Sequence, residues 1–164
     1  MNLAFDKLKI LIADDNPHMR AIISAVLRGL GVRDIREAKD GSEALMALRD
    51  WPADLAIIDY RMTPMDGVAF TKEIRLAEKS PNVYLPIIMV TGYADLSRVV
   101  GAREAGVTEL IVKPVTAEAL ISRINSVIFH PRPFAKTDTY FGPSRRRKRE
   151  AGYQGPDRRM TSLG

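Results

Sequence analysis

Residues 55–59 (Leu-Ala-Ile-Ile-Asp) constrain the fold of this chain more than any other stretch. Four apolar residues, two of them β-branched, have the length and composition of a strand buried on both faces, as in a parallel sheet. The last residue, Asp59, is a carboxylate, and the eight residues after it (YRMTPMDG) are rich in turn formers. Ligands of open α/β sheets bind at this carboxyl edge, so we predict that Asp59 stands at a binding edge.

Apolar runs of strand length alternate with segments of helical periodicity over the first 130 residues. Strands are predicted at residues 8–13, 32–37, 55–59, 86–91 and 109–114, and helices at residues 17–30, 41–49, 67–77, 96–105 and 116–128. Five strands that alternate with five helices favour parallel strands joined by right-handed crossovers, with helices on both faces. The predicted fold class is therefore a doubly wound, five-stranded parallel α/β sheet.

The charge is unevenly distributed along the 164 residues. Residues 131–164 hold nine of the 25 basic and three of the 20 acidic residues, so they carry +6 and the first 130 residues carry −1. The first 130 residues thus have no electrostatic reason to bind nucleic acid or an anionic membrane. The absence of cysteine excludes disulfides and thiolate metal sites. Without a run of about 20 apolar residues or a signal peptide, the expected location is the cytoplasm.

The composition of the chain changes at residue 131, after which prolines and basic residues occur without apolar periodicity. We therefore predict one domain over residues 1–130 and a basic, extended or disordered tail over residues 131–164. The tail contains a basic block at residues 145–149, and a phrase at residues 141–146 (FGPSRR) that recurs at residues 154–159 (QGPDRR). The block is interpreted as a solvated tail, a tether to nucleic acid or an anionic surface, or a partner-docking peptide. No helix-turn-helix pattern is present, so specific DNA binding is not expected.

Polar residues gather where four predicted strands end. Asp14 and Asp15 follow the first strand, Asp59 ends the third, Thr91 ends the fourth and Lys113 lies at the end of the fifth. Three carboxylates at one edge repel unless a cation joins them, and oxygen ligands without cysteine or histidine favour Mg²⁺. A metal, an ammonium and a hydroxyl around a carboxylate suit phosphoryl transfer. Asp59 is the expected nucleophile, which would become an aspartyl phosphate.

This set of residues, together with Pro114, resembles the signature of the response-regulator receiver domain, the CheY-like phosphoacceptor of two-component signalling. The spacing agrees throughout residues 8–129. The resemblance implies a flavodoxin-like sheet in strand order 2-1-3-4-5 with five helices. It also implies that Asp59 accepts the phosphoryl group, that Lys113 pairs with this group and that Thr91 moves to bond it.

The resemblance also implies a metal site and a local backbone geometry. Mg²⁺ is expected to contact Asp15 and Asp59 directly, Asp14 largely through water, and the backbone carbonyl of Arg61. The Lys113–Pro114 bond is expected to be cis, because the cis form has a low free-energy cost only when the next residue is proline.

Two positions affect the output and the lifetime of the phosphorylated form. Leu110 stands where many receivers have a tyrosine or phenylalanine that swings inward, so the aromatic half of that switch is absent. Tyr93 either substitutes for it or is an exposed loop aromatic, and the second interpretation is favoured. Because Arg61 and Tyr93 are bulky and close to Asp59 or Thr91, we expect them to screen the attacking water and to prolong the phosphorylated state.

Three functions compete at this stage. The first is a receiver phosphorylated by a sensor histidine kinase or a histidine phosphotransfer protein, which acts on a downstream protein and is not a turnover enzyme. Its donor is expected to dock at Met19, Pro114 and Val115. The alternative is a phospho-regulated adaptor whose basic tail binds nucleic acid or a partner protein. A Mg²⁺-dependent phosphatase is the least favoured of the three functions, because such an enzyme requires a second acidic residue at the position that Arg61 occupies.

Overall fold

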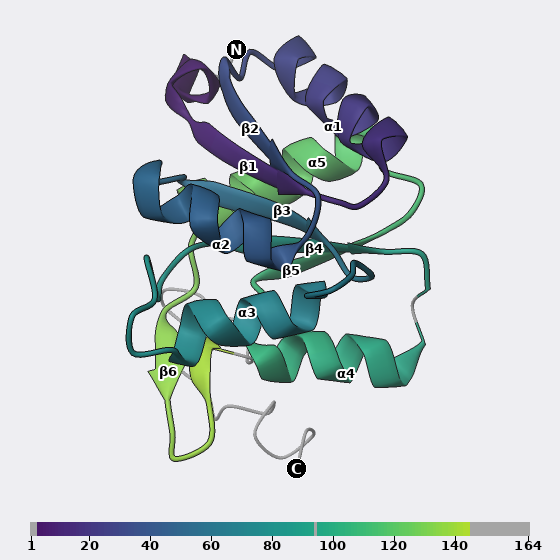
Figure 1. Cartoon of the computed structure of the whole chain (residues 1–164). Coiled ribbons are helices and arrows are strands. Elements are labelled where there is room, and N and C mark those ends of the chain that lie inside the picture. Colours follow the sequence, from purple (N-terminus) through teal and green to yellow (C-terminus); the bar gives the residue numbers. More distant parts are fainter. Residues whose placement is uncertain (1–2, 94, 145–164) are drawn as a thin grey trace, which may run out of the picture.

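A five-stranded parallel sheet forms the centre of the molecule, whose computed structural model describes residues 3–93 and 95–144. The strands are β1 (Lys9–Ala13), β2 (Asp34–Ala38), β3 (Leu55–Asp59), β4 (Ile87–Thr91) and β5 (Glu109–Val112). They are hydrogen-bonded in the order β2-β1-β3-β4-β5, and every neighbouring pair is parallel (Figure 1). The predicted fold class and strand order are confirmed. All residues of β3 and β4 are buried, as their continuous apolar composition requires.

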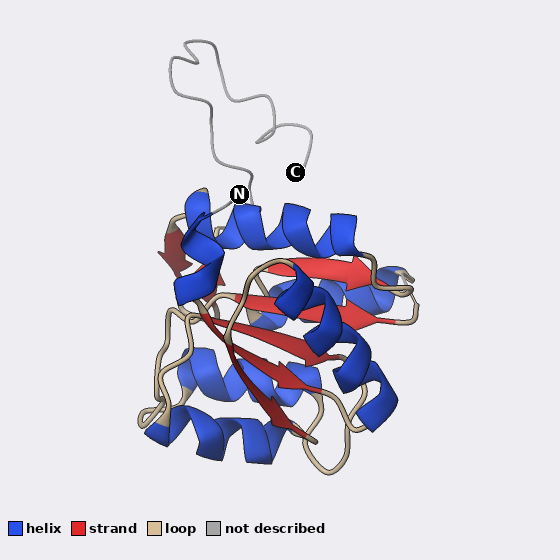
Figure 2. Ribbon diagram, turned by 90° about the horizontal axis from the view of Figure 1, so that it is seen from above, coloured by secondary structure: helices blue, strands red, loops and turns tan. Residues whose placement is uncertain are grey.

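Helices cover both faces of this sheet. They are α1 (Pro17–Gly29), α2 (Gly41–Asp50), α3 (Gly67–Leu76), α4 (Leu96–Ala105) and α5 (Ala117–Ile124), which continues as a π-helical turn, η2 (Asn125–Phe129). A short 3-10 helix, η1 (Leu3–Lys7), precedes β1. Helices α1 and α5 lie on one face and α2, α3 and α4 on the other, as Figures 1 and 2 show. Each face has its own apolar core, centred on Leu27 and Ile124 on one side and on Phe70 and Ile74 on the other.

The strand register brings distant residues to one edge of the sheet. Asp59 is paired with Val90, and Thr91 is paired with Val112. Each of these strands then leaves the sheet at the same side, which is the side where Asp14 follows β1. Three short loops on this side end at capped helices, because the side chains of Asn16, Asp66 and Asp95 accept hydrogen bonds from the first turns of α1, α3 and α4.

The prediction of an extended or disordered tail from residue 131 is wrong for residues 131–144. Strands β6 (Phe134–Lys136) and β7 (Phe141–Pro143) pair antiparallel and form a hairpin, and β7 contacts α3. The strands have three residues each, too few for a periodic signal, and prolines flank or end them. The rings of Phe134, Phe141 and Tyr84 pack together with centroids 5.0–5.6 Å apart. The rest of the predicted tail, residues 145–164, lies outside the described residues.

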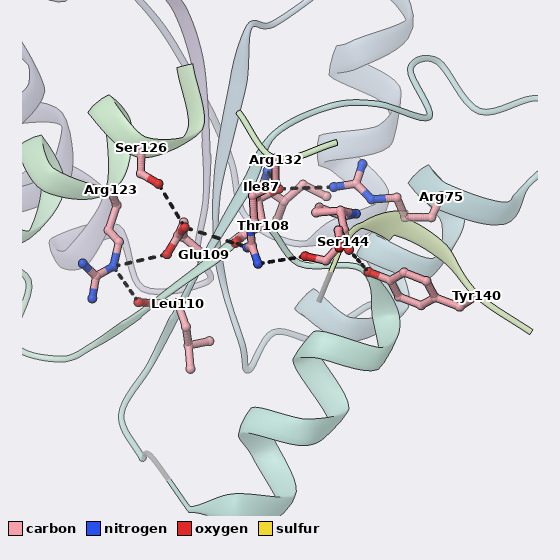
Figure 3. Close-up of polar contacts among 11 residues, drawn as sticks. Arg75, Ile87, Thr108, Glu109, Leu110, Arg123, Ser126, Arg132, Tyr140 and Ser144 are labelled. Atoms are coloured by element: carbon pink, nitrogen blue, oxygen red, sulfur yellow. Dashed lines mark hydrogen bonds and ion pairs between the residues drawn. The ribbon is translucent and has the colours of Figure 1, made fainter. Parts of the chain in front are cut away.

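A buried arginine anchors the hairpin to the amino-terminal edge of the sheet. Arg75 of α3 donates hydrogen bonds to the carbonyls of Gly106 and Val83, both at 3.0 Å, and its guanidinium lies 5.0 Å from the ring centre of Phe134. Burial lowers the pKa of Arg75 to about 10. From the hairpin side, Arg132 donates to the carbonyls of Thr108 and Ser144 (Figure 3). The hairpin is therefore part of the folded body, at the opposite edge of the sheet from Asp59.

Among the helices of the described residues, none has the length and apolar character needed to cross a membrane.

Candidate functional site

Three carboxylates from two strand ends meet at the carboxyl edge of the sheet. One oxygen each of Asp14, Asp15 and Asp59 lie within 4.8 Å of one another. Asp14 and Asp59 are only 1% and 6% exposed, whereas Asp15 faces solvent. The predicted acidic cluster is thus present, with two buried carboxylates and one that is exposed to solvent.

Asp14 lies at the base of this cluster. Its Oδ1 accepts a hydrogen bond of 2.9 Å from the backbone N–H of Asn16, and its Oδ2 is buried without a hydrogen-bond partner in the described structure. Burial, aided by the nearby charge of Asp59, raises the pKa of Asp14 to about 6. A buried carboxylate oxygen that lacks a partner is costly unless a proton or a cation occupies the position beside it.

Arg20 of α1 fixes the loop that carries Asp14. Its Nη1 donates to the backbone carbonyl of Asp14 at 2.7 Å, and its Nε pairs with Glu37 of β2 at 2.9 Å. This contact was not predicted from the sequence. An arginine in the first turns of a helix is an ordinary surface residue, so the sequence offered no signal for it.

Asp59 is held through both of its carboxylate oxygens. Lys113 Nζ lies 2.9 Å from Oδ1, and the backbone N–H of Arg61 donates to Oδ2 at 3.0 Å. Burial raises the pKa of Asp59, while Lys113 and the Arg61 N–H act in the opposite direction. These contacts keep the carboxylate in one orientation with a positive charge beside it. The Lys113–Pro114 bond is cis, as predicted.

Thr91 lies at the same edge, but its hydroxyl bonds its own loop. Oγ1 donates to the carbonyl of Tyr93 at 3.0 Å and accepts from the Tyr93 N–H at 3.2 Å. The side chain of Thr91 is 1% exposed, so its hydroxyl is a buried group tied to the backbone of the β4–α4 loop. A movement of this hydroxyl toward Asp59 would release both contacts.

An arginine of α4 connects the two loops beside Asp59 and Thr91. The guanidinium of Arg98 packs over the rings of Tyr60 and Tyr93, with its carbon 5.2 Å and 4.6 Å from the respective ring centres. Tyr60 follows Asp59 directly in the chain. The sequence singled out Tyr93 but not Arg98 or Tyr60, because nothing in the local pattern indicates a contact between three separate elements.

Gly67 permits the backbone of Asp59 to approach α3. A Cβ atom on Gly67 would lie 2.5 Å from the carbonyl oxygen of Asp59, which is closer than real Cβ atoms come to backbone. The N–H of Gly67 also donates to the carbonyl of Tyr60 at 3.1 Å. A side chain at position 67 would therefore move the end of β3.

The donor set of this site suits a hard divalent cation. It consists of carboxylate oxygens, with no cysteine in the chain, and Asp14 Oδ2 is a buried oxygen without a partner in the described structure. Mg²⁺ prefers such ligands and keeps several of its waters, which the exposed side of Asp15 allows. Of the predicted site residues, Asp14, Asp15, Asp59 and Lys113 are brought together, and Thr91 lies at the same edge. The metal contact of the Arg61 carbonyl stays a prediction.

Comparisons with known proteins agree with this fold and site. A family model described as the response regulator receiver domain matches residues 10–125. The chemotaxis protein CheY-3 of Vibrio cholerae is 38% identical over 120 residues, which cover 73% of this chain and 91% of that protein. The chain therefore belongs to the response regulator receiver family. Proteins of this class take part in two-component signalling.

Solved structures support the same assignment. The chemotaxis protein CheY4 of Vibrio cholerae is 30% identical with a TM-score of 0.68, and the match covers 74% of this chain and 98% of that one. The receiver domain of a sensor histidine kinase from Pseudomonas aeruginosa, with a magnesium ion in its active site cleft, is also 30% identical with a TM-score of 0.65, over 72% of this chain and 94% of that one. The family match ends at residue 125, before the β6–β7 hairpin.

Proposed function

We propose that this chain is a Mg²⁺-dependent phosphoacceptor that takes a phosphoryl group on Asp59 from a phosphohistidine and signals through contacts with other proteins. The observation that carries the proposal is the position of the Asp59 carboxylate. It ends the central strand, shares an acidic cluster with Asp14 and Asp15, and is ion-paired with Lys113 at 2.9 Å.

The contacts of Asp59 support this chemistry. In the proposed step an oxygen of Asp59 forms a bond to phosphorus as the bond from phosphorus to the donor imidazole nitrogen breaks, and the imidazole leaves with that electron pair. Arg61 N–H holds Oδ2 and Lys113 holds Oδ1, so the carboxylate is oriented before the donor arrives. The Lys113 ammonium can then follow the developing charge on the phosphoryl oxygens.

The metal has one role in this proposal. Mg²⁺ held by Asp14, Asp15 and Asp59 supplies positive charge that offsets the repulsion between the carboxylates and the incoming phosphoryl group. Asp14 contributes a buried oxygen that lacks a partner in the described structure, and Asp15 contributes an exposed one.

The chain is proposed to act as a switch and not as a turnover enzyme. The position two residues past Asp59 carries Arg61, where a phosphatase of related architecture would need a second acid to protonate a leaving group. The chain then catalyses only its own phosphorylation and a slow release of phosphate. Its expected donors are a sensor histidine kinase or a histidine phosphotransfer protein in the cytoplasm. Half-buried Met19 and Val115 and exposed Pro114 offer apolar contacts beside the acidic edge for such a donor.

A phosphodonor experiment tests the proposal. The full chain is incubated with acetyl phosphate, with Mg²⁺ or with a chelator, and the product is measured by intact mass and by its lability to hydroxylamine. We expect one acyl phosphate per chain, only with Mg²⁺, and none in Asp59→Asn. Asp54→Asn is the matched control, because Asp54 precedes the same strand and its carboxylate binds the Lys9 N–H at the opposite edge. Phosphate on Asp59→Asn, or repeated turnover of phosphate esters, contradicts the proposal.

A further inference from the structure

A short sequence recurs near the carboxyl end of the chain. Residues 140–146 read Tyr-Phe-Gly-Pro-Ser-Arg-Arg, and residues 153–159 read Tyr-Gln-Gly-Pro-Asp-Arg-Arg, thirteen positions later. Both copies contain the pattern Tyr-x-Gly-Pro. Residues 141–143 of the first copy form strand β7 of the hairpin, whereas the second copy lies outside the described residues. The way in which the first copy docks therefore defines what the shared residues can do.

The docked first copy depends on the three residues that define the pattern. Tyr140 is buried, and its hydroxyl donates to the carbonyl of Pro143 at 2.7 Å. A Cβ atom on Gly142 would lie 2.6 Å from the Tyr140 hydroxyl oxygen and 3.0 Å from the Cα of Gly106, so only glycine fits there. The tyrosine, the glycine and the proline thus form one compact unit, and the second copy contains all three.

The surface that receives this unit contacts its backbone. Gly106 has a φ of +105°, and a Cβ atom there would lie 2.9 Å from Arg75 Cγ and 3.2 Å from the carbonyl oxygen of Phe141. The position between tyrosine and glycine therefore presents its carbonyl to Gly106, which every residue type can do. Arg75 donates to the Thr108 hydroxyl at 3.4 Å beside this position (Figure 3), and Thr108 lines one pocket together with Tyr140 and Pro143. A glutamine, as in the second copy, satisfies the same contact.

We propose that the surface formed by Arg75, Gly106 and Thr108 is an intramolecular receptor for the Tyr-x-Gly-Pro sequence, and that residues 153–156 of the same chain are its alternative occupant. The described chain ends at Ser144, beside this surface, and the second copy begins nine residues later. Nine residues span roughly 30 Å when extended, which is ample for a return to the same surface.

The first copy is the preferred occupant. Four residues separate β6 from β7, whereas 17 residues would separate β6 from residues 154–156, the counterpart of β7 in the second copy. Each doubling of the loop length lowers the probability of loop closure about threefold. The longer loop therefore disfavours the second arrangement roughly tenfold. Gln154 also lacks the ring with which Phe141 contacts Tyr84 and Phe134. The second arrangement is therefore a minor state, and its population rises when a change in the first copy weakens the docking of that copy.

The exchange changes the context of the basic block at residues 145–149. With the first copy docked, the block follows the docked strand. With the second copy docked, the block belongs to the loop that closes the hairpin. The two arrangements thus present the same five basic residues to a partner in different ways.

Paramagnetic relaxation measures the exchange in the full chain. The chain has no cysteine, so Asp157→Cys carries a single nitroxide label next to the second copy, and the ¹⁵N amides of Gly106 and Val107 report on the receptor surface. Asp157 corresponds to Ser144 of the first copy. We expect Tyr140→Ala to raise the relaxation of these amides at least about fivefold over the labelled parent, because it releases the first copy and takes the second arrangement from about a tenth of the population or less to the majority. The reduced label gives the diamagnetic reference.

The second copy is then tested in the same background. Adding Tyr153→Ala to Tyr140→Ala is expected to remove the increase, and Gln154→Ala is expected to preserve it. No increase in Tyr140→Ala, or an increase that survives Tyr153→Ala, overturns the inference. A sample that mixes ¹⁵N-labelled chains with separate nitroxide-labelled chains is expected to show no broadening, and broadening there also overturns it by placing the occupant on another molecule. Unchanged amide shifts around Asp59 confirm that each variant is folded.

Discussion

The guanidinium of Arg98 is packed over the ring of Tyr93, 4.6 Å from the ring centre, and also contacts Tyr60 at 5.2 Å. Tyr93 holds the hydroxyl of Thr91 through its backbone, and Arg98 belongs to α4. The stack therefore connects both loops of the acidic site to one helix. Leu110, at the position where many receivers carry an aromatic residue, cannot form such a contact. This gives α4 a physical connection to the site that does not use position 110.

We expect this stack to carry the response to phosphorylation toward α4. If Thr91 leaves the Tyr93 backbone to bond a phosphoryl group, Tyr93 loses both contacts and its ring is free to shift on Arg98. Amide shifts of Val99 and Val100 on adding Mg²⁺ and beryllofluoride, a phosphoryl mimic, measure this response. Tyr93→Ala and Arg98→Ala should each reduce these shift changes to roughly half or less, because a cation–π contact couples the two elements. Shifts around Asp15 should persist.

Tyr93→Phe is the matched control for this experiment. It keeps the aromatic face over the guanidinium and the backbone contacts to Thr91, so α4 should respond as in the parent chain. A full response of α4 in both alanine variants would show that the stack is only a surface contact.

Arg61 is expected to lengthen the life of the phosphorylated form. Its side chain is exposed while its N–H binds Asp59, so a large group stands beside the acceptor. Arg61→Gly opens a path for water, and we expect phosphate release roughly threefold faster, a change of less than about 1 kcal/mol in the barrier. Phosphate release is measured as the loss of acid-labile phosphate from the protein after the donor has been removed. Arg61→Met keeps the bulk without the charge, and it should release phosphate at the parent rate if screening is the cause. Equal rates in parent and glycine variants would reject the screening interpretation.

The sequence predicted those parts of the molecule that have a strong period or a fixed place at a strand end. Continuous apolar runs such as Leu55 to Ile58 specify a parallel sheet buried on both faces, and the carboxyl ends of its strands place Asp14, Asp59 and Lys113 at one edge. The fold class and the acidic cluster follow from these two facts, whereas the strand order was expected from the resemblance to the receiver family.

The remaining features depend on contacts that have no local pattern. The hairpin is held by the burial of Arg75 beneath Phe134 and by the close approach of Gly142 to Gly106, and each partner lies far away in the sequence. Arg98 is similar, since a single arginine on a helix with polar neighbours does not reveal which rings it packs on. Short strands and single long-range contacts therefore need the structure.

Gly67 is expected to be essential for the position of Asp59. In Gly67→Ala the new Cβ would lie 2.5 Å from the Asp59 carbonyl oxygen and 3.0 Å from Met89 Cε, so the end of β3 must shift. We expect a tenfold or greater loss in the rate of phosphorylation by acetyl phosphate and a stability loss of about 1–3 kcal/mol, typical of overpacking. Urea unfolding and mass spectrometry measure the two effects.

Gly101→Ala is the matched control for this substitution. Gly101 lies in α4, and a Cβ there meets nothing within 4 Å. Alanine should therefore stabilise the chain by about 0.5–1 kcal/mol through helix propensity and leave phosphorylation unchanged. A Gly67→Ala chain that is phosphorylated at the parent rate would show that the end of β3 tolerates the shift.

Asp14 should make the metal-free protein less stable as the pH rises from about 4 to 6. Burial raises its pKa from 3.8 to about 6 in the folded chain, so between these values the folded state keeps a proton that the unfolded state has lost. The free energy of unfolding then falls with rising pH and levels off above pH 6. Two pKa units correspond to about 3 kcal/mol, which is an upper bound for this penalty.

Asp14→Asn removes the charge and keeps an oxygen that can accept from the Asn16 N–H. In a chelator at pH 7.5 we expect this variant to be more stable than the parent by up to about 3 kcal/mol, and the difference should vanish near pH 4, where both forms of position 14 are neutral. Urea unfolding from pH 4 to 8 measures it, with Asp50→Asn as a control at an exposed carboxylate. Saturating Mg²⁺ should reverse the order at pH 7.5, because the ion binds the folded parent more tightly than the variant. A pH-independent difference between the two chains would mean that Asp14 remains ionised throughout this range.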